Sequence, residues 1–483
     1  MRMRGRQNGQ ESQSLLEPFE RREGVSRFAG NALLIWLVML SIPGMLFAQQ
    51  TQQSSPITLQ QAVNIALEKN PERKAALADT KAASADVKEA RSFLLPHVAF
   101  SELATLGNDQ VYVFGTKLHQ QRFTTADFAL NVLNTPAPFG NYSTRFGATW
   151  NLFDSFGSWR AVNRAERAKD AAGHQLERTD QEIVFRVVDS YYQVLFGKKR
   201  LDVAEQSLKT AQAILDRSKN RFESGVAVES DLLSAQVRLA TRKQEVIRAT
   251  DDLAMARAQL GTALGLSTET EFDPVDALAE RNLPATTLEA AEKKAVELRP
   301  DLKRIRSGEA AQQLNVSIAK SSFGPRVNAF AGWETDNPTF VAGGGGNNWM
   351  AGIDVQFDLF EGGAKQARLS HERAMQEKVA AVKEAATDAI RLEVRRAYYD
   401  LDSARQQVEV ARATIAASQE SLRINQNRYD SGLSTITDLL AAEETARRAQ
   451  AEYWEAVYRY HTGYANLELA SGTLNPQSPV VTP

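Results

Sequence analysis

Two charged residues recur around a glycine in this chain and are its clearest candidates for chemistry. The stretch RFESGVAVESDLL begins at Arg221 and contains Asp231. The stretch RYDSGLSTITDLL begins at Arg428 and contains Asp438. A cation is favoured in the last turn of a helix and an anion in the first turn of the next, because the helix dipole is negative at its C-terminus. The pattern predicts two helical tips that carry fixed charges.

Other side chains that could do chemistry are sparse. The chain has no cysteine, which excludes disulfides, thiolate metal sites, cysteine nucleophiles and lipid attachment at a cysteine. Its five histidines show no metal-ligand spacing, and its 57 basic residues nearly balance 59 acidic ones, so no basic excess indicates a nucleic-acid partner. We expect no catalytic residue, no cofactor, no bound metal and no nucleic acid.

Each charged tip joins two long helical runs. No proline lies between Gly157 and Glu223, so one continuous helix there can reach about 100 Å. Small and apolar residues alternate at spacings of three and four on both sides of each tip, a period that produces a left-handed coiled coil. After the first tip the alternating residues are Leu232, Ala235, Leu239, Arg242, Val246, Ala249, Leu253, Ala256, Leu260 and Ala263.

The two halves of the chain are copies of each other. Matching residues stand 229 positions apart at first and 207 apart later, so the first copy carries 22 extra residues (229 − 207) between Pro96 and Phe153. The matching pairs include Leu59–Leu288, Pro71–Pro300, Pro96–Pro325, Phe153–Phe360, Gly225–Gly432 and Asp231–Asp438. The duplication predicts the same order of elements twice, beginning with a short helix that Thr58 caps and Pro71 interrupts.

Strand-like alternation appears twice in each copy. Apolar residues recur at every second position in RVNAFAGWE, NWMAGIDVQFDLF and YSTRFGATWNLF, and the pattern also shifts to strand near Pro96. The last of these stretches places Phe146, Ala148, Trp150 and Leu152 on one face. Alternation over about ten residues with aromatic side chains is typical of membrane β-strands, although a half-buried strand of a soluble sheet has the same period.

The N-terminus indicates export. Several arginines precede the apolar run ALLIWLVMLSIPGMLFA at 32–48, which predicts a signal peptide over 1–48, cut after Ala48; an uncleaved membrane anchor is the alternative. No other stretch has 18 consecutive apolar residues, so a mature chain in a membrane would have to use strands.

These patterns divide the chain into segments of an α plus transmembrane β protein. The expected segments are a signal peptide 1–48, a helical region 49–95, a membrane β-hairpin with an enlarged loop 96–153, a long helical hairpin 154–270, a linker 271–286, a helical region 287–322, a second β-hairpin 323–360, a second long helical hairpin 361–470 and a tail 471–483.

Four strands cannot close a barrel, and open sheet edges are excluded from lipid, so several chains must combine their strands. Two copies would give eight strands and three would give twelve. The helices have too few apolar residues to form a compact core from one chain, and a closed ring would provide neighbours on both sides. We therefore expect a membrane barrel continued by a hollow helical barrel.

Several motifs resemble the outer-membrane efflux protein family, the TolC-like outer-membrane factors of tripartite efflux and type I secretion systems. They are NLFDSFG (151–157) and DLFEGGA (358–364) before the long helices, the two tip motifs, and ANLELASGTL (465–474). The resemblance covers roughly 56–475. It implies a homotrimer in the bacterial outer membrane, with a twelve-stranded barrel in the lipid and an α-helical tunnel in the periplasm.

The same resemblance implies a channel without chemistry of its own. It would passively export substrates that an inner-membrane pump of RND, ABC or MFS type delivers through a periplasmic adaptor. The tip residues that would meet the adaptor are Gly225, Val226, Gly432 and Leu433.

The resemblance also assigns roles to the charged residues. Asp438, with Asp231, would line the periplasmic entrance, and Arg221 and Arg428 would close the tips through ion pairs between helices. Ala441 stands where some members have a second acidic residue, so selectivity should be weaker. A purely structural role for these charges stays open, as does the direction in which Glu443 and Glu444 face.

Two other functions remain as alternatives. An exported coiled-coil spacer without a pore would explain the helices and the signal, but not aromatic strands at the same place in both copies. A periplasmic adaptor also has helical hairpins, but usually only one, within soluble β domains. The residues do not identify the transported substrate.

Overall fold

The structure is a computed structural model that describes residues 55–267, 272–340 and 345–482. These residues belong to one compact unit, Gln52–Pro483. The expected signal peptide 1–48, with its cleavage after Ala48, lies outside the described residues.

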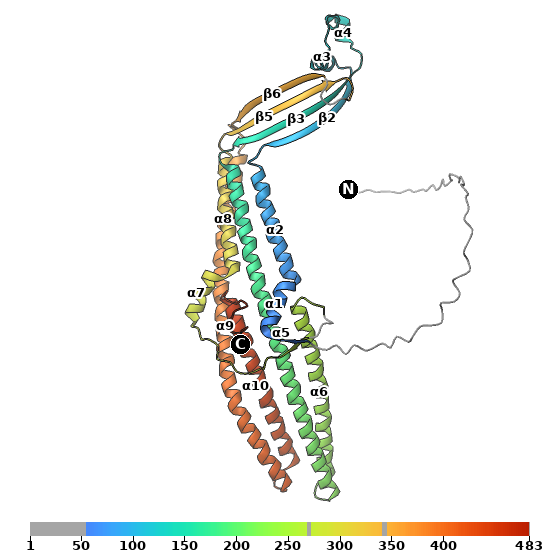
Figure 1. The fold of residues 1–483 in the computed structure, drawn as a ribbon. Helices are drawn as coiled ribbons and strands as arrows, with labels where there is room; N and C mark the ends of the chain where they lie inside the picture. Colours follow the sequence, from blue (N-terminus) through green and yellow to red (C-terminus); the bar gives the residue numbers. More distant parts are fainter. Residues whose placement is uncertain (1–54, 268–271, 341–344, 483) are drawn as a thin grey trace, which may run out of the picture. The chain divides into compact units, whose positions relative to one another are not determined.

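The duplication is confirmed at the level of whole helices (Figure 1). Four helices of the first copy each have a counterpart of the same length in the second copy. The pairs are α1 (Leu59–Lys69) with α7 (Leu288–Leu298), α2 (Pro71–Ser92) with α8 (Pro300–Ser321), α5 (Gly157–Glu223) with α9 (Ala364–Asp430), and α6 (Glu229–Ala263) with α10 (Ile436–Ala470). The continuous helix expected from Gly157 to Glu223 is α5, which has 67 residues.

Local signals explain where the first helices begin. Thr58 accepts a hydrogen bond from the Gln61 backbone N–H, and the Gln61 side chain accepts one from Thr58 N–H, which completes a capping box. Asn70 caps α2, and Pro71 occupies its first turn, where the missing N–H has no helical partner to lose. The interruption at Pro71 thus starts a second helix of 22 residues, longer than the short helix expected.

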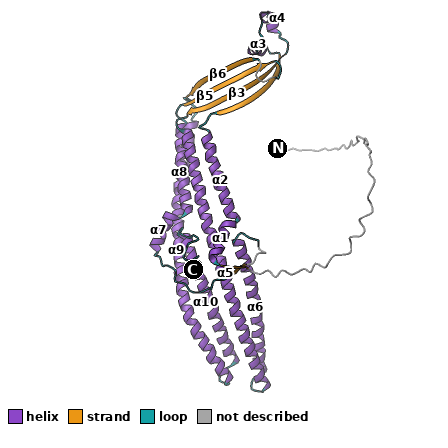
Figure 2. Cartoon of the chain, viewed as in Figure 1, coloured by secondary structure: helices purple, strands orange, loops and turns teal. Residues whose placement is uncertain are grey.

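The four expected strands form one antiparallel sheet (Figure 2). The strands are β2 (His97–Gly107), β3 (Phe139–Phe153), β5 (Arg326–Asn337) and β6 (Gly346–Gln356), in the spatial order β2-β3-β5-β6. The register aligns four aromatic residues, Phe100, Phe146, Trp333 and Trp349, in one row across the sheet. This face of the sheet is the apolar face that the alternation predicted.

The alternation fails at one end of β3. Asn151 pairs with Asn328 and Phe153 with Val327, so Leu152 has no residue opposite it. A β-bulge of this kind adds one residue to one strand and shifts every later side chain to the other face. The regular alternation of β3 therefore ends at Asn151.

The loop of the first β-hairpin has secondary structure of its own. It contains α3 (Gln110–His119), a 3-10 turn η1 (Thr125–Phe128) and α4 (Leu130–Asn134). Only eight residues separate β5 from β6 in the second copy, 338–345. The 22 extra residues of the first copy are accounted for by this insert.

The long helices pack as two antiparallel hairpins, α5 with α6 and α9 with α10. In the half of α5 nearest the tip, three small residues of the predicted alternation are buried: Ala204, Ala211 and Ser218. The helices can therefore approach closely, as the alanine-rich coiled coil required.

A compact core within one chain was not expected from the sequence, but the structure has one. Val187 and Tyr191 of α5 are fully buried in a cluster that also includes Leu260 of α6 and Val480 near the C-terminus. A two-stranded parallel sheet, β1 (Ser55–Ile57) with β4 (Phe272–Pro274), lies beside this core. In the part of the chain that the structure describes, no helix is long and apolar enough to cross a membrane.

Candidate functional site at the hairpin tips

Glycine ends both long helices in the way the sequence predicted. Gly225 has φ +73° and Gly432 has φ +71°, a left-handed conformation that strains any residue with a Cβ. The following amide then reaches back into the helix: Val226 N–H donates to Arg221 O at 2.9 Å, and Leu433 N–H donates to Arg428 O at 2.8 Å. Each chain reversal is therefore tight and fixed by the backbone.

The residues after the two glycines expose apolar side chains. Val226 is 66% exposed and Leu433 is 71% exposed. An isolated apolar side chain on a surface needs no explanation, but two at equivalent tips form a repeated feature. The tips thus offer apolar contacts that one copy of the chain leaves uncovered.

Asp438 is exposed and takes part in a capping box at the start of α10. Its carboxylate accepts hydrogen bonds from the Thr435 hydroxyl at 2.7 Å, the Thr435 N–H at 3.1 Å and the Ser434 hydroxyl at 3.3 Å. The hydrogen bonds from Thr435 lower the pKa of Asp438 below its usual value, with a smaller contribution from Arg428. The carboxylate is therefore held as an anion at the tip.

Asp231 occupies the equivalent position in α6 but has a different environment. It is half-buried, and the residue that caps α6 is Val228, whose side chain cannot accept a hydrogen bond. The two aspartates that the sequence treated as a matched pair are thus not equivalent in structure. Only Asp438 combines full exposure with a fixed carboxylate.

Arg221 connects the two hairpins of one chain. Its Nη1 donates to the backbone oxygens of Tyr429 at 3.0 Å and Asp430 at 3.2 Å, and its guanidinium lies 5.0 Å from the centre of the Tyr429 ring. The Tyr429 hydroxyl is in turn 3.2 Å from Ser218 Oγ. The first hairpin therefore holds the C-terminal end of α9 in the second.

The partners of the two tip arginines differ from the ion pairs expected. Within one copy, Arg221 binds carbonyl oxygens, and Arg428 Nη2 donates to Leu433 O of its own tip at 3.4 Å. Close to the tips, Arg217 and Asp430 instead form an ion pair between the hairpins, at 3.1 Å. The sequence missed Arg217 because it lies one turn before the motif that repeats.

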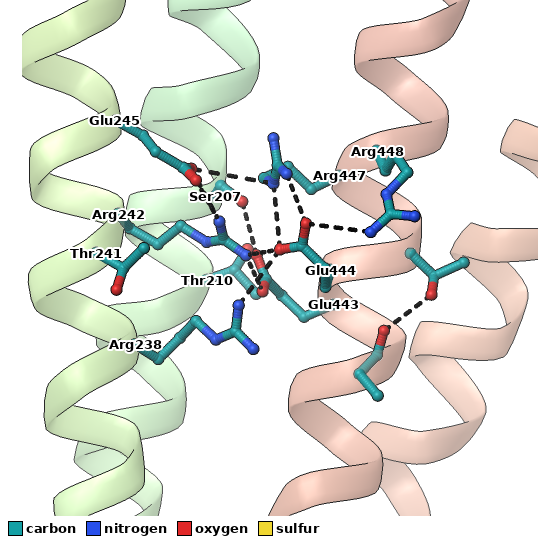
Figure 3. A network of polar contacts seen from close by, with 12 residues as sticks. Ser207, Thr210, Arg238, Thr241, Arg242, Glu245, Glu443, Glu444, Arg447 and Arg448 are labelled. Carbon is teal, nitrogen blue, oxygen red and sulfur yellow. Dashed lines mark hydrogen bonds and ion pairs between the residues drawn. The ribbon is translucent and has the colours of Figure 1, made fainter.

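A buried charge cluster joins the hairpins further from the tips (Figure 3). Arg242 of α6 is 1% exposed and Glu443 of α10 is 2% exposed, and their side chains are 2.7 Å apart. Arg242 also contacts Glu444 at 2.5 Å and Glu245 at 2.8 Å. The second oxygen of Glu443 accepts the Ser207 hydroxyl of α5 at 2.7 Å. Three helices from both copies of the repeat therefore meet at one cluster.

The electrostatics of this cluster favour its charged form. Partial burial opposes ionisation of Glu444, but hydrogen bonds from Arg447 and Arg242 outweigh it and lower the pKa of Glu444 to about 2. Arg447 lies 2.6 Å from Glu444, and Arg238 lies 3.3 Å from it. A signal for this site was present in the sequence, because Arg242 stands at a core position of the coiled-coil alternation. The sequence did not show which way Glu443 and Glu444 point, because their direction depends on how α10 packs against α6.

Among the residues that the structure describes, no three histidine, aspartate or glutamate side chains are grouped closely enough to hold a metal ion. The region therefore combines two tight helical tips, the exposed carboxylate of Asp438 and a buried charge cluster that joins the two hairpins.

The model of the family described as outer membrane efflux protein matches residues 62–266 and 292–473. The chain belongs to the outer membrane efflux protein family. The outer membrane protein TolC of Escherichia coli is 24% identical to it over 470 residues, covering 92% of this chain and 87% of TolC. The alkaline protease secretion protein AprF of Pseudomonas aeruginosa is 22% identical over 430 residues, covering 85% and 84%.

The fold of this efflux protein matches solved outer-membrane channels. The outer-membrane channel OprN superimposes with a TM-score of 0.75 at 21% identity, covering 86% of this chain and 90% of OprN. Family and fold together confirm the expectation from the sequence: the protein is an outer-membrane channel of the efflux and type I secretion class, with its helical part in the periplasm.

Proposed function

We propose that this efflux protein acts as a homotrimer that forms a passive duct from the periplasm to the outside of the cell. Within one copy the sheet has two open edges, β2 and β6, which lipid does not tolerate. These two unpaired edges are the main support for the proposed trimer. Three copies would supply twelve strands, four from each, and pairing of β2 in one copy with β6 in the next would close the barrel.

The proposed partners are a periplasmic adaptor and, through it, an inner-membrane pump of RND, ABC or MFS type. Gly225 and Gly432 make the tips narrow and rigid. Val226 and Leu433 present exposed apolar side chains at their ends. A helical hairpin of the adaptor can pack against such tips with little rearrangement, because a preformed surface loses little entropy on binding.

We assign the periplasmic entrance to the tip of the second hairpin. Three exposed Asp438 carboxylates, one from each copy, would form an anionic ring that favours cations. Ala441 follows one turn later and adds no second acidic ring. Asp231 would contribute less, since it is half-buried. Arg221 and Arg428 would hold the tips closed, the former through the carbonyl oxygens of Tyr429 and Asp430.

The test is single-channel conductance in a planar bilayer, with Asp438→Asn compared to Thr435→Ala. The first variant removes the charge, whereas the second removes the hydroxyl of the capping box and keeps the carboxylate. We expect cation selectivity to fall in Asp438→Asn and to persist in Thr435→Ala. An equal loss of cation selectivity in both variants would mean that selectivity depends on the capping box and not on the ring of negative charge.

A resting channel with closed tips would give little current, so Arg221→Ala and Arg428→Ala are measured alongside. We expect conductance to rise in at least one of them, because each removes contacts that fix the end of a tip. If a correctly folded oligomer carried no current in any of these variants, the result would contradict a duct and favour the coiled-coil spacer.

A further inference from the structure

The insert between β2 and β3 is a folded unit. Phe123 contacts Phe114 and Phe128 edge-to-face, with ring centres 4.8 Å and 5.1 Å apart. Lys117 Nζ lies 2.7 Å from Asp127 Oδ1, and both side chains are mostly buried. Aromatic contacts and a shielded ion pair together give this short segment a small core of its own. We therefore treat the insert as a folded unit and not as an irregular loop.

The insert is fixed to the polar face of the sheet. Gln120, which is 4% exposed, donates to Asn141 Oδ1 at 2.8 Å, and Asn141 Nδ2 donates to Asp336 Oδ1 at 2.6 Å. Asn141 and Asp336 lie on the same face as the ion pair between Arg145 and Glu334, two or four residues further along the strands. That face is opposite to the aromatic row, because side chains alternate along a strand.

The insert also crosses the sheet from one edge to the other. It leaves β2 at Gly107 and reaches the beginning of β6, where the carbonyl of His119 lies against Gly346 so closely that a side chain there would overlap it. His119 Nδ1 is 3.4 Å from Asp336 Oδ2. The helices α2 and α5 join the opposite ends of β2 and β3, so the insert occupies the end of the sheet away from them (Figure 1).

Four apolar side chains of the insert are largely exposed within one copy. Their exposed fractions are 81% for Val111, 47% for Leu118, 63% for Phe128 and 76% for Leu130. Lipid cannot explain them, because the insert binds the polar face and the aromatic face is the one that meets lipid. Several exposed apolar residues on one small unit indicate a contact surface.

We propose that residues 110–134 form a lid over the outer mouth of the channel, and that the inserts of three copies contact one another through these apolar side chains. The inference rests on the proposed trimeric duct. In a closed barrel the polar face lines the lumen, so a unit fixed to that face extends over the lumen rather than over the membrane. Three such units, one from each third of the barrel, converge toward the axis. The lid narrows the exit at the end opposite the periplasmic tips.

The absence of cysteine makes the lid directly testable. Leu130→Cys introduces a single thiol on the insert, and Ile353→Cys introduces one on the apolar face of β6, where the native side chain is 67% exposed. Both are made in an Arg428→Ala background and compared in planar bilayers. A charged thiosulfonate reagent added on the outer side should lower the conductance of Leu130→Cys several-fold and leave that of Ile353→Cys unchanged. After oxidation by copper–phenanthroline, Leu130→Cys should also form disulfide-linked dimers, seen on non-reducing gels.

A second variant removes the lid. Replacing 110–134 with a short glycine-serine loop, like the short connection of the second β-hairpin, should raise the conductance several-fold. Unchanged conductance in this variant, together with unchanged current from fully labelled Leu130→Cys, would overturn the lid while the duct itself stands. A parent protein that forms no trimer and conducts no ions would instead overturn the proposed duct, and the lid with it. Mass spectrometry establishes that labelling is complete.

Discussion

At the scale of single residues, the buried cluster around Arg242 is the contact most sensitive to substitution. Arg242→Met would leave Glu443 buried with one hydroxyl partner and no cation. Loss of one partner of a buried ion pair costs about 3–5 kcal/mol, because the remaining charge is neither hydrated nor neutralised. We expect a lower midpoint of thermal unfolding, measured by circular dichroism in detergent.

The matched control is the double variant Arg242→Met with Glu443→Leu, which removes both charges and keeps the volume apolar. Replacement of a buried ion pair by well-packed apolar residues is often neutral or stabilising. The double variant should therefore regain most of the lost stability. If it were as unstable as Arg242→Met alone, the contacts of Arg242 with Glu444 and Glu245 would have to carry the effect.

Asp438 gives a prediction about pH. Its pKa lies below the ordinary aspartate value because Thr435 donates to the ionised carboxylate. An acid with a lowered pKa in the folded state stays ionised until the pH falls below the ordinary value, so both the cap and the negative charge are retained above pH 4. We expect cation selectivity to be constant between pH 7 and pH 5. A loss of selectivity centred within this range would assign the selectivity to another group.

The sequence identified the tip residues because glycine and charge have local signatures, but it could not identify their partners. The left-handed conformation of Gly225 and the position of Asp438 in the first turn of α10 depend on a few neighbouring residues. The contact of Arg221 with Tyr429 joins residues 208 positions apart. Such a contact depends on how the two hairpins pack, which no local pattern specifies.

At the scale of elements, the glycine at each tip sets the geometry of the hairpin. Gly432→Ala places a Cβ in a left-handed conformation, which costs about 1–2 kcal/mol. The loss should be local, since the tip is an exposed end of the helices. Hydrogen–deuterium exchange of the amides at 433–436 should be faster, with no change near the core.

The control for this substitution is Gly173→Ala, in the interior of α5 and far from the tip. Gly173 has a helical conformation, and a Cβ there would meet no heavy atom within 4 Å. Alanine should stabilise the helix by about 0.5–1 kcal/mol relative to glycine. Faster exchange at the tip in both variants would show that the effect does not come from the left-handed conformation.

Long elements were predictable and short ones were not. The 67-residue helices and the strands of 11 to 15 residues repeat their period often enough to be recognised. The three-residue strands β1 and β4 have no period, and they pair only because the core brings Ser55–Ile57 beside Phe272–Pro274. The expectation that one chain lacks a core failed for the same reason, since α1, α5, α6 and the C-terminal segment contribute to it together.

At the scale of the whole molecule, the two faces of the four-stranded sheet determine which side chains contact lipid. Ala351 aligns with Ala331 and Ala148 on the face of the aromatic row, whereas its neighbour Met350 points to the opposite face. A lysine on the lipid face of a membrane strand costs about 2–4 kcal/mol near the middle of the bilayer, while the lumen face is hydrated. The two adjacent positions therefore lie at nearly the same depth in the membrane but on opposite faces of β6.

We expect Ala351→Lys to prevent assembly and Met350→Lys to allow it. The proposed trimer repeats the cost of Ala351→Lys in three copies, so the total reaches about 6–12 kcal/mol, comparable to the free energy that keeps a protein folded. The measurement is the yield of oligomer whose mobility on gels changes on heating, after folding into lipid bilayers. Equal yields from the two variants would mean that the aromatic face does not contact lipid. A lower yield from Met350→Lys than from Ala351→Lys would mean that the faces are reversed, which would also place the insert 110–134 over the membrane instead of the lumen.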